Sequence, residues 1–277
     1  MSETSDEHLL LVRDLVVDYG SSTAVGAGGT KAVDGVSFHV DRGETLALVG
    51  ESGCGKSTTA FAVAGLLRPT SGSITFLGQD IATLRRRELK EHRRHLAVVF
   101  QDPYSSLNPR MRIDQIVLEP LQAHREVKGD GRTVAAELLD RVGLDPRLVT
   151  RYPRELSGGQ RQRVCIARAL ALGPDLLICD EATSSLDVSM QAQIINLLKD
   201  LQEQLQMSYL FISHDLAVVN SISDRIAVMY AGRIVEEGPA ESVVTRPQSE
   251  YAKTLLAAAL TVHTAPADST ETPGGAA

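Results

Sequence analysis

The stretch GESGCGKST at residues 50–58 constrains the fold of this chain more than any other feature. It follows a short apolar segment, TLALV, that is typical of a buried strand, and it leads into KSTTAFAVAGLL, whose apolar residues recur at helical spacing. A Gly-x-x-x-x-Gly-Lys-Ser pattern between a strand and a helix is typical of a loop that wraps backbone N–H groups around a phosphate. The stretch therefore predicts a phosphate site at a helix N-terminus, where the helix dipole adds positive potential.

Each part of this loop has a chemical role. We expect the Lys56 ammonium to reach the β- and γ-phosphates of a nucleotide and the Ser57 hydroxyl to ligate Mg²⁺. A chance glycine-rich turn is the alternative, but the flanking strand and helix argue against it. Cys54 stands at an unconstrained position and is interpreted as incidental. The expected nucleotide-binding residues of the loop are Gly50, Glu51, Ser52, Gly53, Cys54, Gly55, Lys56, Ser57 and Thr58.

The segment LLICDE at residues 176–181 supplies the carboxylates that such a loop needs. Four apolar residues predict a buried strand that brings Asp180 to its end, where it is expected to hold the magnesium, through water. Glu181 follows at the carboxyl end of the strand, where open α/β sheets bind ligands. A carboxylate there could deprotonate an attacking water, an effect of roughly 10²–10⁴ in rate.

A second candidate anion site lies in ELSGGQRQR at residues 155–163. Ser157 and Gln160 have the spacing of a capping box, and Gly158 and Gly159 leave the first N–H groups of the helix unshielded. Taken alone, this pattern fits a plain capped helix as well as a phosphate site.

Strand-like and helix-like segments alternate along the chain, which predicts an α/β fold with a mainly parallel, helix-covered sheet. Residues 103–156 are helical in pattern and are expected to form a lobe inserted between strands. Residues 85–95 carry six Lys or Arg against two Glu, and they fit either a solvated helix or a phosphate-binding patch. We place the main domain at 8–240, a C-terminal helical extension at 241–260 and a disordered tail at 261–277.

Composition argues against several classes of protein. The net charge of −7 argues against nucleic acid as a partner. The three cysteines form no C-x-x-C pair, so neither a disulfide framework nor a structural zinc site is indicated. No run approaches the roughly 20 apolar residues that span a bilayer, and the acidic N-terminus does not resemble a secretory signal.

Taken together, GESGCGKST, the strand end VVFQ, LSGGQ and CDEATSSLD resemble the nucleotide-binding subunit of ABC transporters over about residues 9–240. The resemblance implies a P-loop NTPase fold with a mixed-sheet core, an antiparallel β subdomain and an inserted helical lobe. It also implies that ATP and Mg²⁺ are bound. In that family LSGGQ is the signature sequence, which binds the γ-phosphate of ATP held by the facing subunit. The resemblance therefore implies a head-to-tail dimer.

Four further positions match the family pattern. Tyr19 resembles the aromatic residue that stacks on adenine. Gln101 resembles the glutamine that contacts magnesium and the attacking water. Asp187, at the end of SSLD, resembles the loop residue that touches the site of the other subunit, and His214 resembles the switch histidine that contacts the γ-phosphate.

Within the family, FQDPYSSLNPRM, AVDGVSF and the C-terminal RPQSEYAKTLLAA resemble the peptide, dipeptide and nickel importer subgroup. The subgroup implies integral-membrane permease partners, a solute-binding protein and a location on the cytoplasmic face of the cell membrane. The partner ATPase could be a second copy or a related subunit. Two features depart from relatives: the subgroup's His-Pro-Tyr-Thr motif is altered to Gln-Ser-Glu-Tyr around 248–251, and no cysteine follows Cys179, so no iron–sulfur site is expected.

Two other functions stay open at this point. The first is a soluble ABC ATPase that is not coupled to a permease, although such chains often carry two cassettes or long inserted arms. The second is an ATP-binding regulatory module that does not hydrolyse ATP, against which the presence of Glu181 and His214 argues.

Overall fold

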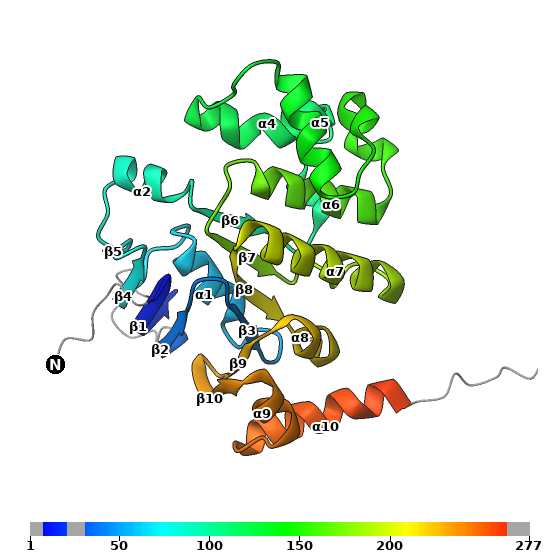
Figure 1. The fold of residues 1–277 in the computed structure, drawn as a ribbon. Helices are drawn as coiled ribbons and strands as arrows, with labels where there is room; N and C mark the ends of the chain where they lie inside the picture. The colour runs from blue at the N-terminus through cyan, green and yellow to red at the C-terminus, as the bar shows by residue number, and fades with distance from the viewer. Residues whose placement is uncertain (1–7, 21–30, 265–277) are drawn as a thin grey trace, which may run out of the picture.

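The computed structural model describes residues 8–20 and 31–264, and its centre is a six-stranded sheet in the order β10-β9-β3-β8-β7-β6 (Figure 1). The strands are parallel except for β10, which pairs antiparallel with β9. Their bounds are β3 Thr45–Val49, β6 Leu96–Val99, β7 Leu176–Asp180, β8 Ser208–Ser213, β9 Arg225–Tyr230 and β10 Arg233–Pro239. The predicted α/β class with a mainly parallel sheet is confirmed.

A four-stranded antiparallel sheet, in the order β2-β1-β4-β5, lies beside this core. Its strands are β1 Leu10–Asp18, β2 Lys31–Val40, β4 Ser71–Phe76 and β5 Gln79–Asp80. The sequence pattern predicts one strand over residues 72–81, but the chain turns back on itself at Leu77 and Gly78. Both residues have positive φ, 50° and 76°, which is the geometry of a tight two-residue hairpin.

Helices cover the six-stranded sheet and build the predicted lobe, which lies at the top of Figure 1. The lobe contains α3 Pro103–Ser106, α4 Ile113–His124, α5 Gly131–Arg141 and two 3₁₀ turns, Pro146–Thr150 and Pro153–Glu155. The remaining helices are α1 Lys56–Val63, α2 Arg86–His92, α6 Gly158–Leu170, α7 Val188–Leu205, α8 Leu216–Ile222, α9 Ala240–Thr245 and α10 Glu250–Thr264. Helix α8 has no counterpart among the predicted elements.

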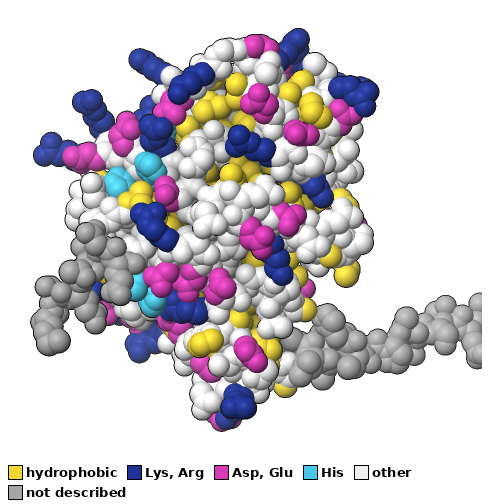
Figure 2. All heavy atoms as spheres, in the orientation of Figure 1, with side chains coloured by type: hydrophobic (Ala, Val, Ile, Leu, Met, Phe, Trp, Pro, Cys, Tyr) yellow, Lys and Arg dark blue, Asp and Glu magenta, His cyan; other side chains and the backbone are white. Residues whose placement is uncertain are grey.

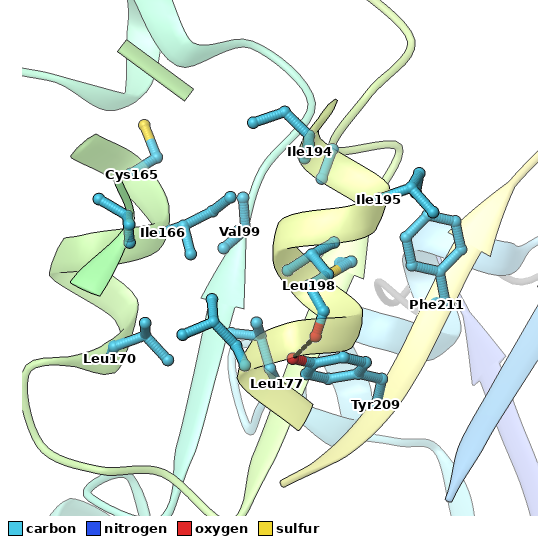
Figure 3. Close-up of a cluster of buried hydrophobic side chains, with 14 of the residues drawn as sticks. Val99, Cys165, Ile166, Leu170, Leu177, Ile194, Ile195, Leu198, Tyr209 and Phe211 are labelled. Atoms are coloured by element: carbon cyan, nitrogen blue, oxygen red, sulfur yellow. Dashed lines mark hydrogen bonds between the residues drawn. The ribbon is translucent and has the colours of Figure 1, made fainter. Parts of the chain in front are cut away.

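The six-stranded sheet separates two hydrophobic clusters because successive side chains of a strand point to opposite faces. Ala47 and Val49 of β3 belong to the cluster shared with the lobe, whereas Leu46 and Leu48 belong to the cluster shared with the antiparallel sheet. Figure 3 shows part of the first cluster, in which the buried Tyr209 hydroxyl donates to the Leu198 carbonyl of α7 over 2.7 Å.

The basic segment at residues 85–95 forms α2 and a turn after it. Lys90 Nζ donates to the Ala123 carbonyl over 2.8 Å, and Arg94 pairs with Glu126 over 2.8 Å. In the face drawn in Figure 2, Lys and Arg side chains are interspersed with Asp and Glu. These contacts favour the interpretation as a solvated helix over a phosphate-binding patch.

The chain after β10 forms α9 and α10, in the range 241–260 where a helical extension is predicted. Helix α10 continues to Thr264, so residues 261–264, predicted above as part of the disordered tail, are helical. The remainder of the predicted tail, 265–277, lies outside the described residues, as does the predicted loop at 21–30. Within the described ranges, no helix has both the length and the hydropathy to cross a membrane.

Candidate nucleotide site

Four neighbouring strands deliver the predicted site residues to one edge of the sheet. The phosphate loop follows β3, Gln101 follows β6, Asp180 and Glu181 lie at the end of β7, and His214 follows β8. Because β3, β8, β7 and β6 are adjacent and parallel, their carboxyl ends meet at the same edge. That edge is where open α/β sheets bind their ligands.

Two glycines of the phosphate loop have no room for a side chain. A Cβ on Gly50, whose φ is 151°, would lie 2.2 Å from the Met229 carbonyl oxygen. A Cβ on Gly55, whose φ is 108°, would lie 2.2 Å from the Ala32 carbonyl oxygen. The loop is therefore packed against the backbone of β9 and β2, and only glycine fits at these two positions.

Lys56 begins α1 and is 4% exposed. Its ammonium donates to the carbonyl oxygens of Gly50 and Glu51, each over 2.8 Å, and lies 3.7 Å from Cys54 Sγ. A buried ammonium without such acceptors would be strongly destabilising. The lysine therefore lies inside the loop, where a phosphate would add further acceptor oxygens. The intervening Ser52 and Gly53 are exposed.

The Ser57 hydroxyl donates to Asp180 Oδ1 over 2.9 Å, which joins α1 to the end of β7. Asp180 is 6% exposed, and burial raises the pKa of its carboxyl, an effect that the Ser57 hydrogen bond opposes and the nearby Glu181 reinforces. A hydroxyl and a carboxylate side by side are the hard oxygen donors that Mg²⁺ prefers. The residues therefore fit the predicted metal, which would also relieve the buried negative charge.

Glu181 lies between the two other predicted catalytic residues. One carboxylate oxygen accepts a hydrogen bond from Gln101 Nε2 over 2.8 Å, and the other lies 3.3 Å from His214 Nδ1. Glu181 has a positive φ of 48°, which is uncommon for a residue with a side chain. The residue thus leaves the strand in a sharp turn that presents its carboxylate between a glutamine and an imidazole from the two neighbouring strands.

The stretch at residues 157–160 forms the predicted capping box. Ser157 Oγ accepts from the Gln160 N–H over 3.3 Å, and Gln160 Oε1 accepts from the Ser157 N–H over 2.9 Å. Gly158 and Gly159 form the first turn of α6, and a Cβ on Gly159 would meet the end of the Met190 side chain. Among the described residues, no hydrogen bond or ion pair joins 157–160 to the phosphate loop of the same chain.

Asp187 lies at the start of α7, and Tyr19 lies on the surface near the start of α1. Asp187 caps α7 by accepting a hydrogen bond from the Met190 N–H over 2.9 Å. The side chain of the same Met190 packs over Gly159, so Asp187 lies one helical turn from that contact. Tyr19 is 61% exposed, and its hydroxyl lies 3.3 Å from Thr58 Oγ1 at the start of α1. Its ring therefore lies on the surface beside the phosphate loop.

One residue at the site was not predicted. The hydroxyl of Tyr251, in the first turn of α10, accepts a hydrogen bond from the Glu51 N–H over 3.1 Å. The sequence shows this tyrosine in the altered tail motif, but no signal connects it with a loop that lies 200 residues earlier. Its position becomes visible only when α10 is packed on the core.

The chain is similar in sequence and fold to several known proteins. Residues 33–184 match the profile of the family described as ABC transporter. Over 230 residues the chain is 54% identical to a probable peptide ABC transporter ATP-binding protein of Sinorhizobium fredii. The match covers 83% of this chain and 65% of that protein. Over 260 residues it is 50% identical to a putative peptide import ATP-binding protein of Brucella abortus. This match covers 92% of this chain and 78% of that protein.

A third relative is longer. The glutathione import ATP-binding protein GsiA of Salmonella choleraesuis is 51% identical over 256 residues, and the match covers 91% of this chain but 41% of GsiA. Among solved structures, the ATP-binding cassette MJ0796 bound to ADP and Pi, in a dimeric post-hydrolysis state, superimposes with a TM-score of 0.73 at 30% identity. That match covers 83% of this chain and 98% of the cassette. The cbiO1 protein of Clostridium perfringens superimposes with a TM-score of 0.75 at 30% identity, over 87% and 92% of the two chains.

Proposed function

The chain belongs to the ABC transporter family, and from that premise we propose that it hydrolyses ATP to energise a membrane importer of peptides or a related small solute. The observation that carries the proposal is the position of the Glu181 carboxylate. It is held between Gln101 and His214, beside the Ser57–Asp180 pair and the phosphate loop. This arrangement has both a phosphate-binding part and a proton acceptor.

The side chains have separate roles in this proposal. The loop N–H groups and Lys56 bind the β- and γ-phosphates, and bound Mg²⁺ supplies positive charge at the phosphate oxygens, with Ser57, Asp180 and Gln101 as the residues that would hold it. Glu181 accepts a proton from water as the water oxygen attacks the γ-phosphorus. The bond to the bridging oxygen of ADP breaks, and ADP and phosphate are the products.

Gln101 and His214 orient the carboxylate and the attacking water. Both contact Glu181 from neighbouring strands, so its two oxygens have fixed directions. A near-attack geometry of this kind lowers the barrier because less orientational freedom is lost in the transition state.

The signature stretch is proposed to serve a second nucleotide. The start of α6 offers the Ser157 hydroxyl and a glycine-rich first turn, yet it makes no hydrogen bond to the phosphate loop within the described residues. We place it against the ATP of a facing ATPase subunit, either a second copy or a related chain, with Asp187 near the same interface. Tyr19, on the surface beside Thr58, is placed against the adenine.

The import function named for the relatives supports the partners that we propose. Two of them are named as peptide ABC transporter or peptide import proteins and one as a glutathione import protein, so we propose a peptide-class solute. Permease subunits, and a solute-binding protein that delivers the solute, complete the importer. The ATPase would then lie on the cytoplasmic face of the cell membrane, held there by the permease.

The experiment that tests the proposal is purification of the tagged chain from detergent-solubilised membranes, followed by identification of the bound proteins and a phosphate-release assay. We expect two multi-span permease subunits and Mg²⁺-dependent phosphate release that Glu181→Gln abolishes. Recovery of nucleic acid or an enzyme complex without a permease would support an ABC ATPase that acts without transport. Equal phosphate release by the unsubstituted protein and Glu181→Gln would support a regulatory module.

A further inference from the structure

The peptide unit between Gly50 and Glu51 is held from both of its polar ends. Its carbonyl oxygen, on Gly50, accepts from Lys56 Nζ over 2.8 Å, and its N–H, on Glu51, donates to the Tyr251 hydroxyl over 3.1 Å. Because a peptide unit is planar, fixing its N–H also fixes the direction of its carbonyl. Tyr251 therefore controls the orientation of one of the two carbonyl groups that hold the buried lysine.

Tyr251 is held in place by a ring contact of its own and by the anchoring of the helix that carries it. Its ring packs on that of Tyr230, at the end of β9, with centroids 4.4 Å apart. The Glu236 carboxylate of β10 accepts from the N–H groups of Gln248 and Ser249, each over 2.8 Å, just before α10 begins. A negative charge at a helix N-terminus is favourable, so Glu236 fixes the start of the helix that carries the tyrosine.

The apolar face of α10 adds to this placement. Ala252, next to Tyr251, is 1% exposed, and Leu255 and Leu256 pack against the cluster that contains Val49 of β3. The strand that ends in the phosphate loop and the helix that carries Tyr251 thus share one core. The helix that carries Tyr251 cannot move away from the loop without a shift of this packing.

We infer that Tyr251 is a positioning residue for ATP binding: its hydroxyl fixes the Gly50–Glu51 peptide and, through it, Lys56. The C-terminal extension thereby becomes part of the phosphate site. The hydrogen bond to the Glu51 N–H also draws electron density toward the Gly50 carbonyl, which makes that oxygen a better acceptor for the ammonium. This inference rests on the proposed ATP binding and adds a residue to it.

The test is the substitution Tyr251→Phe, which removes one oxygen and keeps the ring on Tyr230. ATP affinity is measured by equilibrium binding to the purified chain with Mg²⁺, and KM and kcat are measured by phosphate release. We expect Kd and KM for ATP to rise about two- to tenfold, the size of one neutral hydrogen bond at a solvent-accessible site, with kcat within about twofold. The matched control is Tyr230→Phe, which removes a neighbouring hydroxyl that makes no hydrogen bond in the described chain, and should leave both constants unchanged.

A second comparison separates positioning from general stability. Glu236→Ala releases the start of α10, so it should raise the Kd for ATP in the same direction. The combination with Tyr251→Phe should raise it less than the product of the two single effects, because both act through one contact. Unfolding midpoints of the single variants identify any loss of fold.

The outcomes are distinguishable. If the unsubstituted chain does not bind ATP, the proposed function itself fails. If it binds ATP and Tyr251→Phe binds equally well, the inference about Tyr251 is overturned and the proposed function stands. A Tyr230→Phe effect as large as that of Tyr251→Phe, or a fully multiplicative double variant, would also overturn it.

Discussion

Glu181→Gln is the substitution that most directly tests the proposed chemistry. The change replaces one carboxylate oxygen by an NH₂ group of nearly the same size. The new amide oxygen can still accept from Gln101 Nε2, and the new NH₂ can face His214 Nδ1, so both contacts seen in the structure can persist. The fold and the phosphate loop should therefore be unchanged, while the negative charge and the ability to accept a proton are lost.

The expected loss follows from the role of a general base, which contributes roughly 10²–10⁴ in rate. At about 1.4 kcal/mol for each factor of ten, the barrier should rise by roughly 3–6 kcal/mol. ATP affinity should stay within about threefold, because Lys56, Ser57 and Asp180 keep their contacts. With binding intact and turnover blocked, the ATP-bound dimer should accumulate.

Three measurements check this prediction: phosphate release, equilibrium ATP binding, and size-exclusion elution with ATP and Mg²⁺. Glu203→Gln is the matched control, since it makes the same chemical change at an exposed position of α7 and should behave as the unsubstituted protein. Turnover of Glu181→Gln within tenfold of the unsubstituted rate would refute Glu181 as the proton acceptor. A monomeric elution profile in the presence of ATP and Mg²⁺ would refute the trapped dimer.

Three further predictions concern other parts of the chain. Ser157→Arg should leave ATP binding within about threefold but abolish phosphate release, because the signature stretch is proposed to act on the facing subunit; normal turnover would mean that the stretch is only a helix cap. Tyr209→Phe removes the buried hydrogen bond to the Leu198 carbonyl and should lower the free energy of unfolding by about 1 kcal/mol in denaturant titrations, with ATP binding unchanged. Burial, followed by the charge of Arg225, lowers the pKa of His39 below 6.5, so the stability this group contributes is present above pH 6.5 and lost as pH falls through the lowered pKa. His39→Gln should therefore flatten the fall in stability below pH 6.5, and an unchanged pH profile would contradict this assignment.

Much of the site could be predicted because its signals are local. The phosphate loop, the strand end at Asp180 and the capping box at Ser157 each depend on residues within about ten positions of one another, and each has a physical reason that a short pattern captures. Their meeting at one sheet edge follows from the parallel strands.

The contacts that were missed depend on packing over long distances. Nothing near Tyr251 in the sequence indicates that its hydroxyl contacts Glu51, because that contact is set by how α10 packs on the core. The turn at Leu77 and Gly78 was missed for a different reason: a leucine with positive φ gives no turn signal, and a single glycine in a strand-like pattern indicates a bulge rather than a hairpin.

The position of β3 has a consequence for how this protein is made. All five of its residues are buried, and all except Thr45 are apolar. Its two neighbouring strands are β8, where Tyr209 pairs with Thr45, and β9. These partners are translated about 160 to 180 residues after it, which at roughly 5–20 residues per second takes roughly 10–35 s. During that interval β3 can pack on the earlier strands β1 and β2, but the backbone N–H and C=O groups along both of its edges have no strand partner in the nascent chain. We therefore expect aggregation through these unpaired edges, and its prevention by ribosome-associated chaperones, to affect the yield of folded protein.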